Sequence, residues 1–230
     1  MAAAGSGQRL GAGGPKAFVP LAGRPMVEWS IEAFRTCAAV RSIVVACPPG
    51  HGHELTGHGL DVVEGGATRA QSVACALRTV GTDLVAIHDA ARPLVTPELI
   101  EEVVATLAAD PAAAGVIAAT PVTDTIKRVR EATKDAFATQ DGGNASLVIE
   151  STLDRDQLWA AQTPQVFRAA ALREALEADD GRVATATDEA ILIEASGGKV
   201  LIHPSPAENL KVTTPLDLGL AEALLADRVH

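Results

Sequence analysis

Apolar residues occur along this chain in short runs that are typical of buried strands. One run covers residues 42–47 and ends at Pro48-Pro49-Gly50, and the others cover residues 60–64, 83–88, 114–120 and 200–203. Near-continuous apolar runs are found where both faces of a sheet are covered, as in parallel sheets. The pattern therefore predicts a sheet that is buried on both faces.

Between these runs the chain predicts helices. Met26, Val27, Ile31 and Phe34 recur at the spacing of a helix with one apolar face. Further helices are expected at about residues 67–80, 97–109, 168–178 and 187–195 and after Thr214-Pro215. Strands that alternate with helices predict an α/β fold, with a Rossmann-like, mostly parallel sheet and helices on both faces.

Residues 125–162 depart from this alternation. Two weakly alternating segments, at residues 126–130 and 146–150, flank a polar stretch that ends in Asp141-Gly142-Gly143-Asn144. We expect a long hairpin here, an arm over about residues 126–160, within one domain that spans residues 1–230. A bare hairpin is marginal in water unless it packs on something, so the arm is interpreted as a dimerisation element; a mobile loop is the alternative.

The bulk composition excludes several classes of protein. A net charge of −10 argues against non-specific binding to nucleic acid, although a local basic pocket could still hold a nucleotide. No apolar run approaches the roughly 18–20 residues of a membrane span, so we expect no membrane partner. Cys37, Cys47 and Cys75 show no C-x-x-C spacing, which suits the reduced thiols of a cytoplasmic protein.

The first sixteen residues contain five glycines, the cations Arg9 and Lys16, and almost no apolar bulk. Free N–H groups in a glycine-rich turn form an anion-binding concavity, which predicts a loop around a polyphosphate. A flexible N-terminal tail is the alternative. The loop is neither a P-loop, because Ala17 follows the lysine, nor a dinucleotide fingerprint, because Leu10 replaces its third glycine.

Two further clusters follow predicted strands, where ligands bind in such sheets. In residues 88–93, Asp89 could hold Mg²⁺ and Arg92 could bind a phosphate bidentately; a structural Asp–Arg pair is the alternative. The loop at residues 65–72 suits close backbone contact with a ribose or base, and helix capping by Thr68 is the alternative. Three histidines at positions 51, 53 and 58 fit no standard metal spacing and are interpreted as part of a solvated loop.

Together these clusters resemble the 2-C-methyl-D-erythritol 4-phosphate cytidylyltransferase family, which belongs to the nucleotidyltransferases with a GT-A-like α/β fold. The resemblance runs in family order over essentially the whole chain. Its pieces are Ala3-Ala4-Gly5-x-Gly7-x-Arg9, Pro15-Lys16, Gly65-Gly66-x-x-Arg69-x-x-Ser72, His88 to Pro93, Asp124-Thr125-x-Lys127, Leu153-Asp154-Arg155, Gln162-Thr163-Pro164-Gln165, Thr187-Asp188-Glu189-Ala190 and Asn209-x-Lys211-Val212-Thr213.

The resemblance implies the transfer of CMP from CTP to 2-C-methyl-D-erythritol 4-phosphate, with release of pyrophosphate, in the non-mevalonate isoprenoid pathway. It implies that Mg²⁺ is the cofactor, held at Asp89. Catalytic roles fall to Arg9, Lys16, Asp89 and Lys211. The nucleotide would contact Ala3, Ala4, Gly5, Gly7, Gly66 and Ser72, and the sugar phosphate would contact Arg92, Thr163 and Lys211. Thr125, Arg155 and Thr187 would reach that phosphate from the second subunit of a homodimer.

Three departures from the family pattern are visible. The family precedes its loop with an apolar strand, so the first strand of the sheet is expected to be missing here. Ala2 stands where the family usually has proline, and Ala67 replaces a common acidic residue, which weakens the case for cytosine. The alternatives are a ribitol-5-phosphate cytidylyltransferase or another sugar-phosphate nucleotidyltransferase, a non-catalytic nucleotide-binding module, and a dehydrogenase with a degenerate dinucleotide loop.

Overall fold

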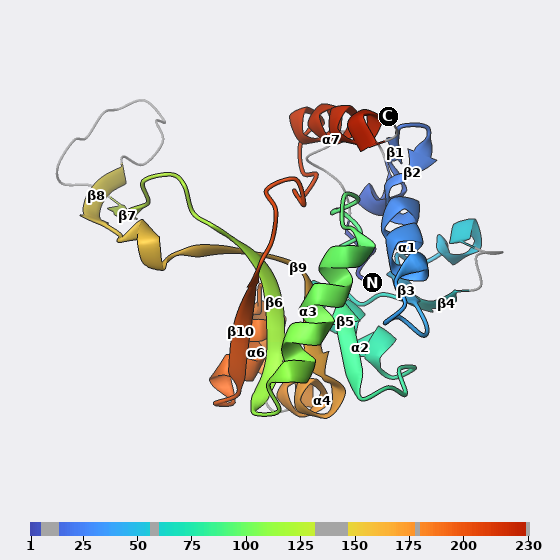
Figure 1. Cartoon of the computed structure of the whole chain (residues 1–230), viewed down its shortest axis with the longest axis horizontal. Coiled ribbons are helices and arrows are strands. Elements are labelled where there is room, and N and C mark those ends of the chain that lie inside the picture. Colours follow the sequence, from blue (N-terminus) through green and yellow to red (C-terminus); the bar gives the residue numbers. More distant parts are fainter. Residues whose placement is uncertain (6–13, 56–59, 132–146, 178–179, 229–230) are drawn as a thin grey trace, which may run out of the picture. The chain divides into compact units, whose positions relative to one another are not determined.

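The computed structural model describes residues 1–5, 14–55, 60–131, 147–177 and 180–228 (Figure 1). These residues form two compact units: residues 1–119 together with 161–230, and residues 120–160. The second unit contains the predicted arm. The first contains the sheet and the helices that cover it.

The sheet of the first unit has two parts. Four strands lie in the order β10 (Lys199–Pro204), β6 (Ala113–Pro121), β9 (Trp159–Arg168) and β5 (Leu84–Ile87), and a separate parallel pair joins β3 (Val44–Cys47) to β4 (Asp61–Glu64). The pairing of β10 with β6 is also parallel, whereas β5 and β9 are antiparallel. A short hairpin, β1 (Pro20–Leu21) with β2 (Arg24–Pro25), lies apart from both.

The first three residues connect these two parts. Ala2 forms parallel bridges with Ala46 on one side and Asp89 on the other. Its N–H donates to the carbonyl of His88 at 2.8 Å, and the N–H of Ala3 donates to the carbonyl of Ala46 at 2.9 Å. This short segment therefore takes the place of a strand between β3 and β5.

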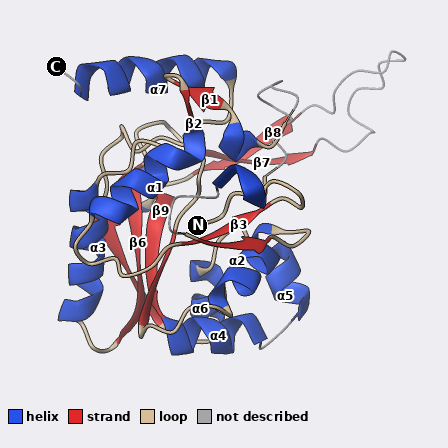
Figure 2. Ribbon diagram, turned by 90° about the vertical axis from the view of Figure 1, so that its right-hand side faces the viewer, coloured by secondary structure: helices blue, strands red, loops and turns tan. Residues whose placement is uncertain are grey.

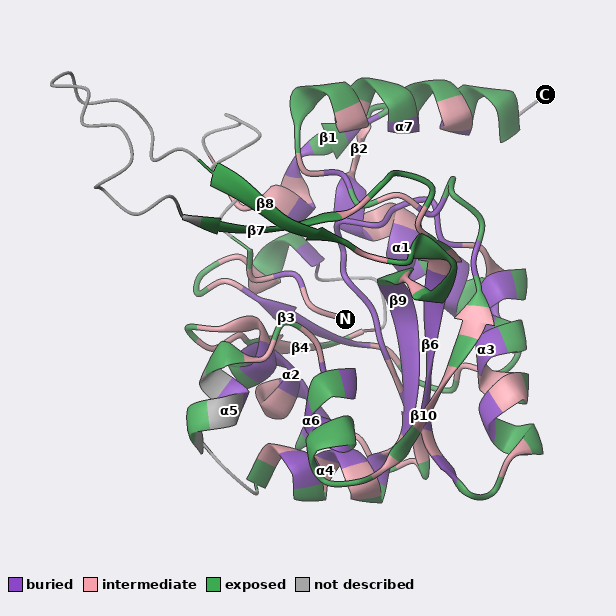
Figure 3. Ribbon diagram, turned by 90° about the vertical axis from the view of Figure 1, so that its left-hand side faces the viewer, coloured by how far each residue is buried: buried purple, intermediate pink, exposed green. Residues whose placement is uncertain are grey.

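Helices cover both faces of the sheet (Figure 2). The helices of this unit are α1 (Met26–Thr36), α2 (Arg69–Leu77), α3 (Pro97–Ala109), α4 (Ala169–Glu177), α5 (Asp180–Thr185), α6 (Ala190–Ala195) and α7 (Pro215–Arg228), with short 3₁₀ turns at η2 (Lys16–Phe18) and η3 (Gly52–Leu55). Val116 packs with α1 and α3, whereas its neighbour Ile117 packs with α2, α4 and α6. Successive residues of a strand point to opposite faces, so β6 is buried on both, as Figure 3 shows.

The α/β class, the mostly parallel sheet and the helices on both faces are thus confirmed. Strand β9 was not predicted: residues 159–162 were assigned to the hairpin region, Arg168 to a following helix, and residues 163–167 to no element. Gln162, Thr163 and Gln165 interrupt its apolar pattern, although all three are buried in the structure. Helix α5 was also missed, and α2 and α6 are shorter than predicted.

In the second unit, β7 (Lys127–Glu131) pairs antiparallel with β8 (Leu147–Thr152), and η4 (Arg155–Gln157) follows. Val129 lies opposite Ile149, and Leu147 lies on the same face two residues before Ile149. All three side chains are exposed. The hairpin therefore carries an uncovered apolar face.

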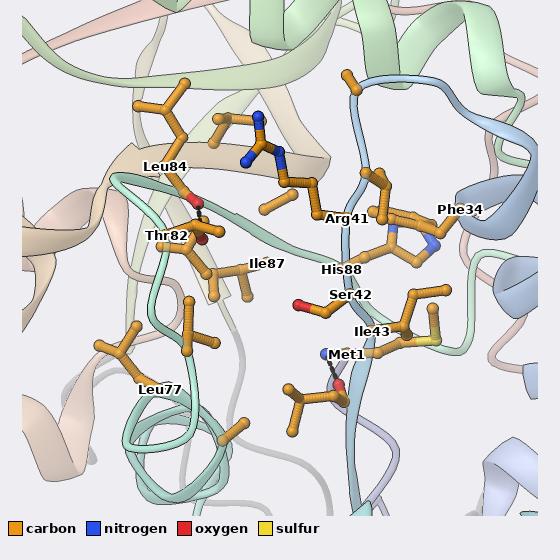
Figure 4. A pocket seen from close by; sticks show the side chains of 18 of the residues that line it. Met1, Phe34, Arg41, Ser42, Ile43, Leu77, Thr82, Leu84, Ile87 and His88 are labelled. Carbon is orange, nitrogen blue, oxygen red and sulfur yellow. Dashed lines mark hydrogen bonds between the residues drawn. The ribbon is translucent and has the colours of Figure 1, made fainter. Parts of the chain in front are cut away.

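Within the first unit, a cavity of about 490 Å³ lies beside Met1 (Figure 4). Leu84 and Ile87 line it, as do Ile43 and Val44 from β3 and the residues just before it. The buried amino group of Met1 donates to the carbonyl of Val44 at 2.7 Å, and burial lowers the pKa of this amine to about 6. Because Ala2 bridges β3 and β5, the space beside Met1 is about as wide as one strand.

We expect this cavity to accept an extended apolar segment. Five β-branched residues appended before Met1 would bury apolar side chains there, pair with the facing strand edges and convert the buried amine into an amide. The melting temperature should rise by several degrees, because ~1 kcal/mol shifts it by about 2–4 °C in a domain of this size. A segment of five Gly and Lys residues is the control, and equal melting temperatures for the two proteins would contradict the expectation.

Candidate functional site

A pocket of about 640 Å³ lies where the strands and the bridging segment end. Asp89 follows β5, Gly66 follows β4, and Ala3 to Gly5 continue the bridging segment. Eight of the predicted site residues line this pocket: Ala3, Ala4, Gly5, Lys16, Gly66, Ser72, Asp89 and Lys211. Arg9 and Gly7 lie outside the described residues.

The two described ends of the glycine-rich loop meet at the pocket. The N–H of Lys16 donates to the carbonyl of Gly5 at 3.0 Å, and η2 begins at Lys16. Ala17, the next residue, is buried against the apolar core beneath. This arrangement holds Lys16 in the lining of the pocket that Asp89 and Lys211 also line.

The loop before α2 is built for close packing. Thr68 and Gln71 form a reciprocal capping box at the helix start. The Ser72 hydroxyl accepts from the N–H of Gly66 at 3.1 Å and donates to the carbonyl of Thr68 at 2.9 Å. A Cβ on Gly66 would lie 2.4 Å from the Cβ of Gln71, so this position requires glycine. The capping interpretation of this loop is therefore confirmed, while contact with a ribose or base stays a prediction.

Asp89 lies between two cations. Its Oδ1 accepts from Nε of Arg69 at 2.9 Å, and its Oδ2 accepts from Nζ of Lys211 at 2.6 Å. Burial acts to raise the pKa of Asp89, but Arg69 and Lys211 together hold it well below its usual range. The carboxylate is therefore ionised and fixed at both oxygens.

Arg69 also binds a second carboxylate, that of Glu189. Its Nη1 donates to both oxygens of Glu189, at 2.7 and 2.6 Å. Burial opposes the charge on Arg69, yet Glu189 and Asp89 raise its pKa above the usual value. Burial raises the pKa of Glu189, and Arg69 opposes that rise. The sequence motifs contained both residues but gave them no role, because only the tertiary fold brings them together.

A buried chain of hydrogen bonds shapes the turn after β5. The Thr163 hydroxyl accepts from the N–H of Asp89 at 3.1 Å and contacts Nδ1 of His88 at 3.0 Å, while Nε2 of His88 donates to the carbonyl of Arg92 at 3.1 Å. Burial lowers the pKa of His88 to about 3, so the ring is neutral. Because a carbonyl can only accept, Nε2 carries the proton and the hydroxyl donates to Nδ1.

Arg92 is buried but does not line the pocket. Its guanidinium donates to the carbonyl of Asn209 at 2.7 Å and to that of Ala161 at 3.3 Å. Burial lowers the pKa of Arg92. Its Nε has no hydrogen-bond partner among the described residues.

A polar network positions the segment that carries Lys211. Nδ2 of Asn209 donates to Oε1 of Gln162 and to the carbonyl of Thr163, both at 2.9 Å. On the other side of the lysine, the N–H of Val212 donates to the carbonyl of Ala91 at 2.8 Å. Lys211 is thus held between β9 and the turn that carries Asp89.

Five of the predicted residues that the structure describes do not line the pocket: Arg92, Thr163, Thr125, Arg155 and Thr187. Thr125 and Arg155 belong to the arm unit, where both are exposed and Nη1 of Arg155 donates to the carbonyl of Thr123 at 2.6 Å. Thr187 is exposed just before α6.

The donor set limits what metal the pocket could hold. Within the described ranges, no group of three or more His, Cys, Asp or Glu side chains is placed to bind a metal ion. His51 contacts Glu54 and His53 contacts the carbonyl of Gly50, while His58 lies outside the described residues. Asp89 supplies the carboxylate of the pocket. One carboxylate suits a Mg²⁺ ion that arrives with nucleotide phosphates and water rather than a resident metal.

Comparison with known proteins agrees with this arrangement. The model of the 2-C-methyl-D-erythritol 4-phosphate cytidylyltransferase family matches residues 1–227. The enzyme of that name from Frankia casuarinae is 45% identical over 97% of this chain and 79% of its own length, and that of Synechococcus sp. CC9902 is 39% identical over 99% and 97%. The chain also matches a bifunctional IspD/IspF enzyme of Anaeromyxobacter at 42% identity, where it spans 56% of the longer protein.

Solved structures give the same result. The crystal structure of 2-C-methyl-D-erythritol 4-phosphate cytidylyltransferase from Thermus thermophilus matches with a TM-score of 0.77 and 34% identity, over 97% of this chain and 96% of that one. In the described part of this chain, no helix is long and apolar enough to cross a membrane. Sequence, fold and pocket together establish that this chain belongs to the 2-C-methyl-D-erythritol 4-phosphate cytidylyltransferase family.

Proposed function

We propose that this protein transfers CMP from CTP to 2-C-methyl-D-erythritol 4-phosphate and releases pyrophosphate, as a step of the non-mevalonate isoprenoid pathway. Membership of the family supports this function. The observation that carries it in the structure is the convergence of Lys16, Asp89 and Lys211 on one pocket at the ends of the strands. We further propose a cytoplasmic location, supported by free thiols at Cys37, Cys47 and Cys75.

In this proposal the nucleotide lies along the glycine-rich loop. Backbone groups of Ala3, Ala4, Gly5 and Gly7 would hold the triphosphate, with Arg9 and Lys16 supplying positive charge. Gly66 and Ser72 would lie near the cytosine and ribose. Because the Ser72 hydroxyl already binds Gly66 and Thr68, its contribution would be to shape the loop that meets the base.

The sugar phosphate would bind beyond Asp89. Lys211 lines the pocket, and its ammonium can turn from Asp89 to an incoming phosphate. The family resemblance also assigns Arg92 to this phosphate, but here its guanidinium is buried outside the pocket and donates to the carbonyls of Asn209 and Ala161. Thr163 would act here chiefly by fixing the turn through His88.

The reaction needs no covalent intermediate, because the substrate phosphate is already a nucleophile. Its oxygen attacks the α-phosphorus of CTP in line, and the bond from that phosphorus to the β-phosphate oxygen breaks with its electron pair leaving on pyrophosphate. The chain's own residues position the two phosphates and neutralise the negative charge that spreads over them. Mg²⁺ bound with the nucleotide would supply further neutralisation beside Asp89.

We also propose that the protein is a homodimer whose arms complete the sites. The exposed apolar face of the hairpin, formed by Val129, Leu147 and Ile149, supports this, since an uncovered apolar surface on a two-stranded hairpin favours a partner. Thr125, Arg155 and Thr187 would then contact the phosphate of the substrate bound to the other subunit.

The direct test measures pyrophosphate release from CTP with Mg²⁺ and each acceptor. Release that depends on methylerythritol phosphate supports the proposal, and preference for ribitol 5-phosphate would identify the alternative acceptor. A protein that binds CTP without releasing pyrophosphate would be a non-catalytic nucleotide-binding module.

Replacing Lys16 by alanine should lower kcat/KM by about 10²–10³, because one preorganised charge at the triphosphate is lost. Its melting temperature should stay close to that of the unchanged protein. Lys199→Ala is the matched control, since this lysine pairs with Asp110 outside the pocket. Near-normal turnover by Lys16→Ala would remove this lysine from the mechanism.

Ile149→Lys should weaken the dimer at least tenfold, because it places a charge in the apolar face of the hairpin. Sedimentation velocity across a concentration series measures the change. Val148→Lys is the control: it lies on the opposite face of β8 and is 39% exposed, against 61% for Ile149. Equal association of both variants would place the interface elsewhere.

A further inference from the structure

Two charged residues at the site have no part in the mechanism above. Arg69 is the first residue of α2, where the capping box fixes the backbone, and Glu189 directly precedes α6. The Glu189 side chain is only 1% exposed, so its charge is removed from water and depends on Arg69. Arg69 in turn joins this carboxylate to that of Asp89.

The two cations that hold Asp89 differ in how firmly they are held. Arg69 donates to three carboxylate oxygens on two residues, and its side chain is 23% exposed. Lys211 is 42% exposed and reaches Asp89 through a single contact at 2.6 Å. A lysine ammonium is a point charge on a flexible stem, whereas a guanidinium bound at several nitrogens is fixed in orientation. Lys211 is therefore the cation that can move.

We propose that Glu189 and Arg69 are positioning residues that keep Asp89 permanently neutralised, so that Lys211 is free to leave it for a substrate phosphate. The inference rests on the function proposed above and deepens it. Glu189 holds the guanidinium of Arg69 in place, and that guanidinium holds Oδ1 of Asp89. The ammonium of Lys211 can then leave Oδ2 of Asp89 and bind the substrate phosphate.

The charges explain why such a lock is needed. The four side chains carry two negative and two positive charges and balance as a set. Without Arg69, Lys211 would be the counter-ion left to Asp89 within this set. It would then be held in place just as an anionic phosphate arrives, and the buried carboxylates would repel that phosphate. If the Arg69–Glu189 pair served stability alone, its replacement would leave the binding of the phosphate by Lys211 unchanged.

The test is a double-mutant cycle. Arg69→Lys keeps the charge but loses the fork that reaches both carboxylates. In the otherwise unchanged protein it should lower kcat/KM for the sugar phosphate about 10–100-fold. In the Lys211→Met background the same change should cost less than threefold, because no lysine remains to be released. Equal costs in the two backgrounds would overturn the proposal.

A binding measurement needs neither turnover nor metal. Calorimetry with pyrophosphate and metal-free protein measures the binding. Arg69→Lys should weaken it about tenfold in the otherwise unchanged protein. In a protein that already carries Lys211→Met, the same change should weaken binding less than threefold. Unweakened binding in the first case would also overturn the proposal. This measurement tests the role of Arg69 and Glu189 independently of the reaction. A protein that binds pyrophosphate in this pattern but transfers no CMP would contradict only the proposed function.

Glu189→Gln provides a second variant if Arg69→Lys does not fold. This change preserves the shape of the side chain but removes the charge that holds Arg69 in place. It should lower kcat/KM about tenfold in the otherwise unchanged protein and less than threefold in a protein that already carries Lys211→Met. Circular dichroism melting checks folding in each case. A variant that loses stability while keeping full kcat/KM would show that the pair is structural, and the proposal would fall.

Discussion

The site depends on the hydrogen bonds that hold Ala2 between β3 and β5. Through the described pairings, this residue is the link between the parallel pair and the four-stranded part of the sheet. Because the bridges are parallel, the segment that follows Ala2 emerges at the same edge as Gly66 and Asp89. Backbone geometry alone thus brings Ala3 to Gly5, a second glycine turn and a carboxylate around one pocket.

Once brought together, the charges must balance one another. Asp89 and Glu189 are buried, and a buried carboxylate is tolerated only when paired and hydrogen-bonded. Arg69 and Lys211 meet this need. These four side chains therefore balance in charge, although the protein as a whole carries a charge of −10.

The sequence predicted the fold where local pattern decides it. Helix α3 was predicted with its observed bounds, because Thr96 caps it, Pro97 begins it and apolar residues recur along it. Strand β9 was missed because its buried polar residues, such as Gln162 and Gln165, obscure the apolar run, and their hydrogen-bond partners lie far away in the sequence. The pocket residues after strands were predictable from the rule that ligands bind at strand ends. The Arg69–Glu189 contact was not, since 120 positions separate the two residues.

The direction of the hydrogen bonds at His88 has a consequence for what Thr163 can meet. The proton of the hydroxyl is committed to the imidazole, and one lone pair is committed to the amide of Asp89. Only the remaining lone pair is available, so any group that meets this oxygen must bring a proton of its own. An alcohol on a polyol chain satisfies that condition, whereas a fully ionised phosphate does not.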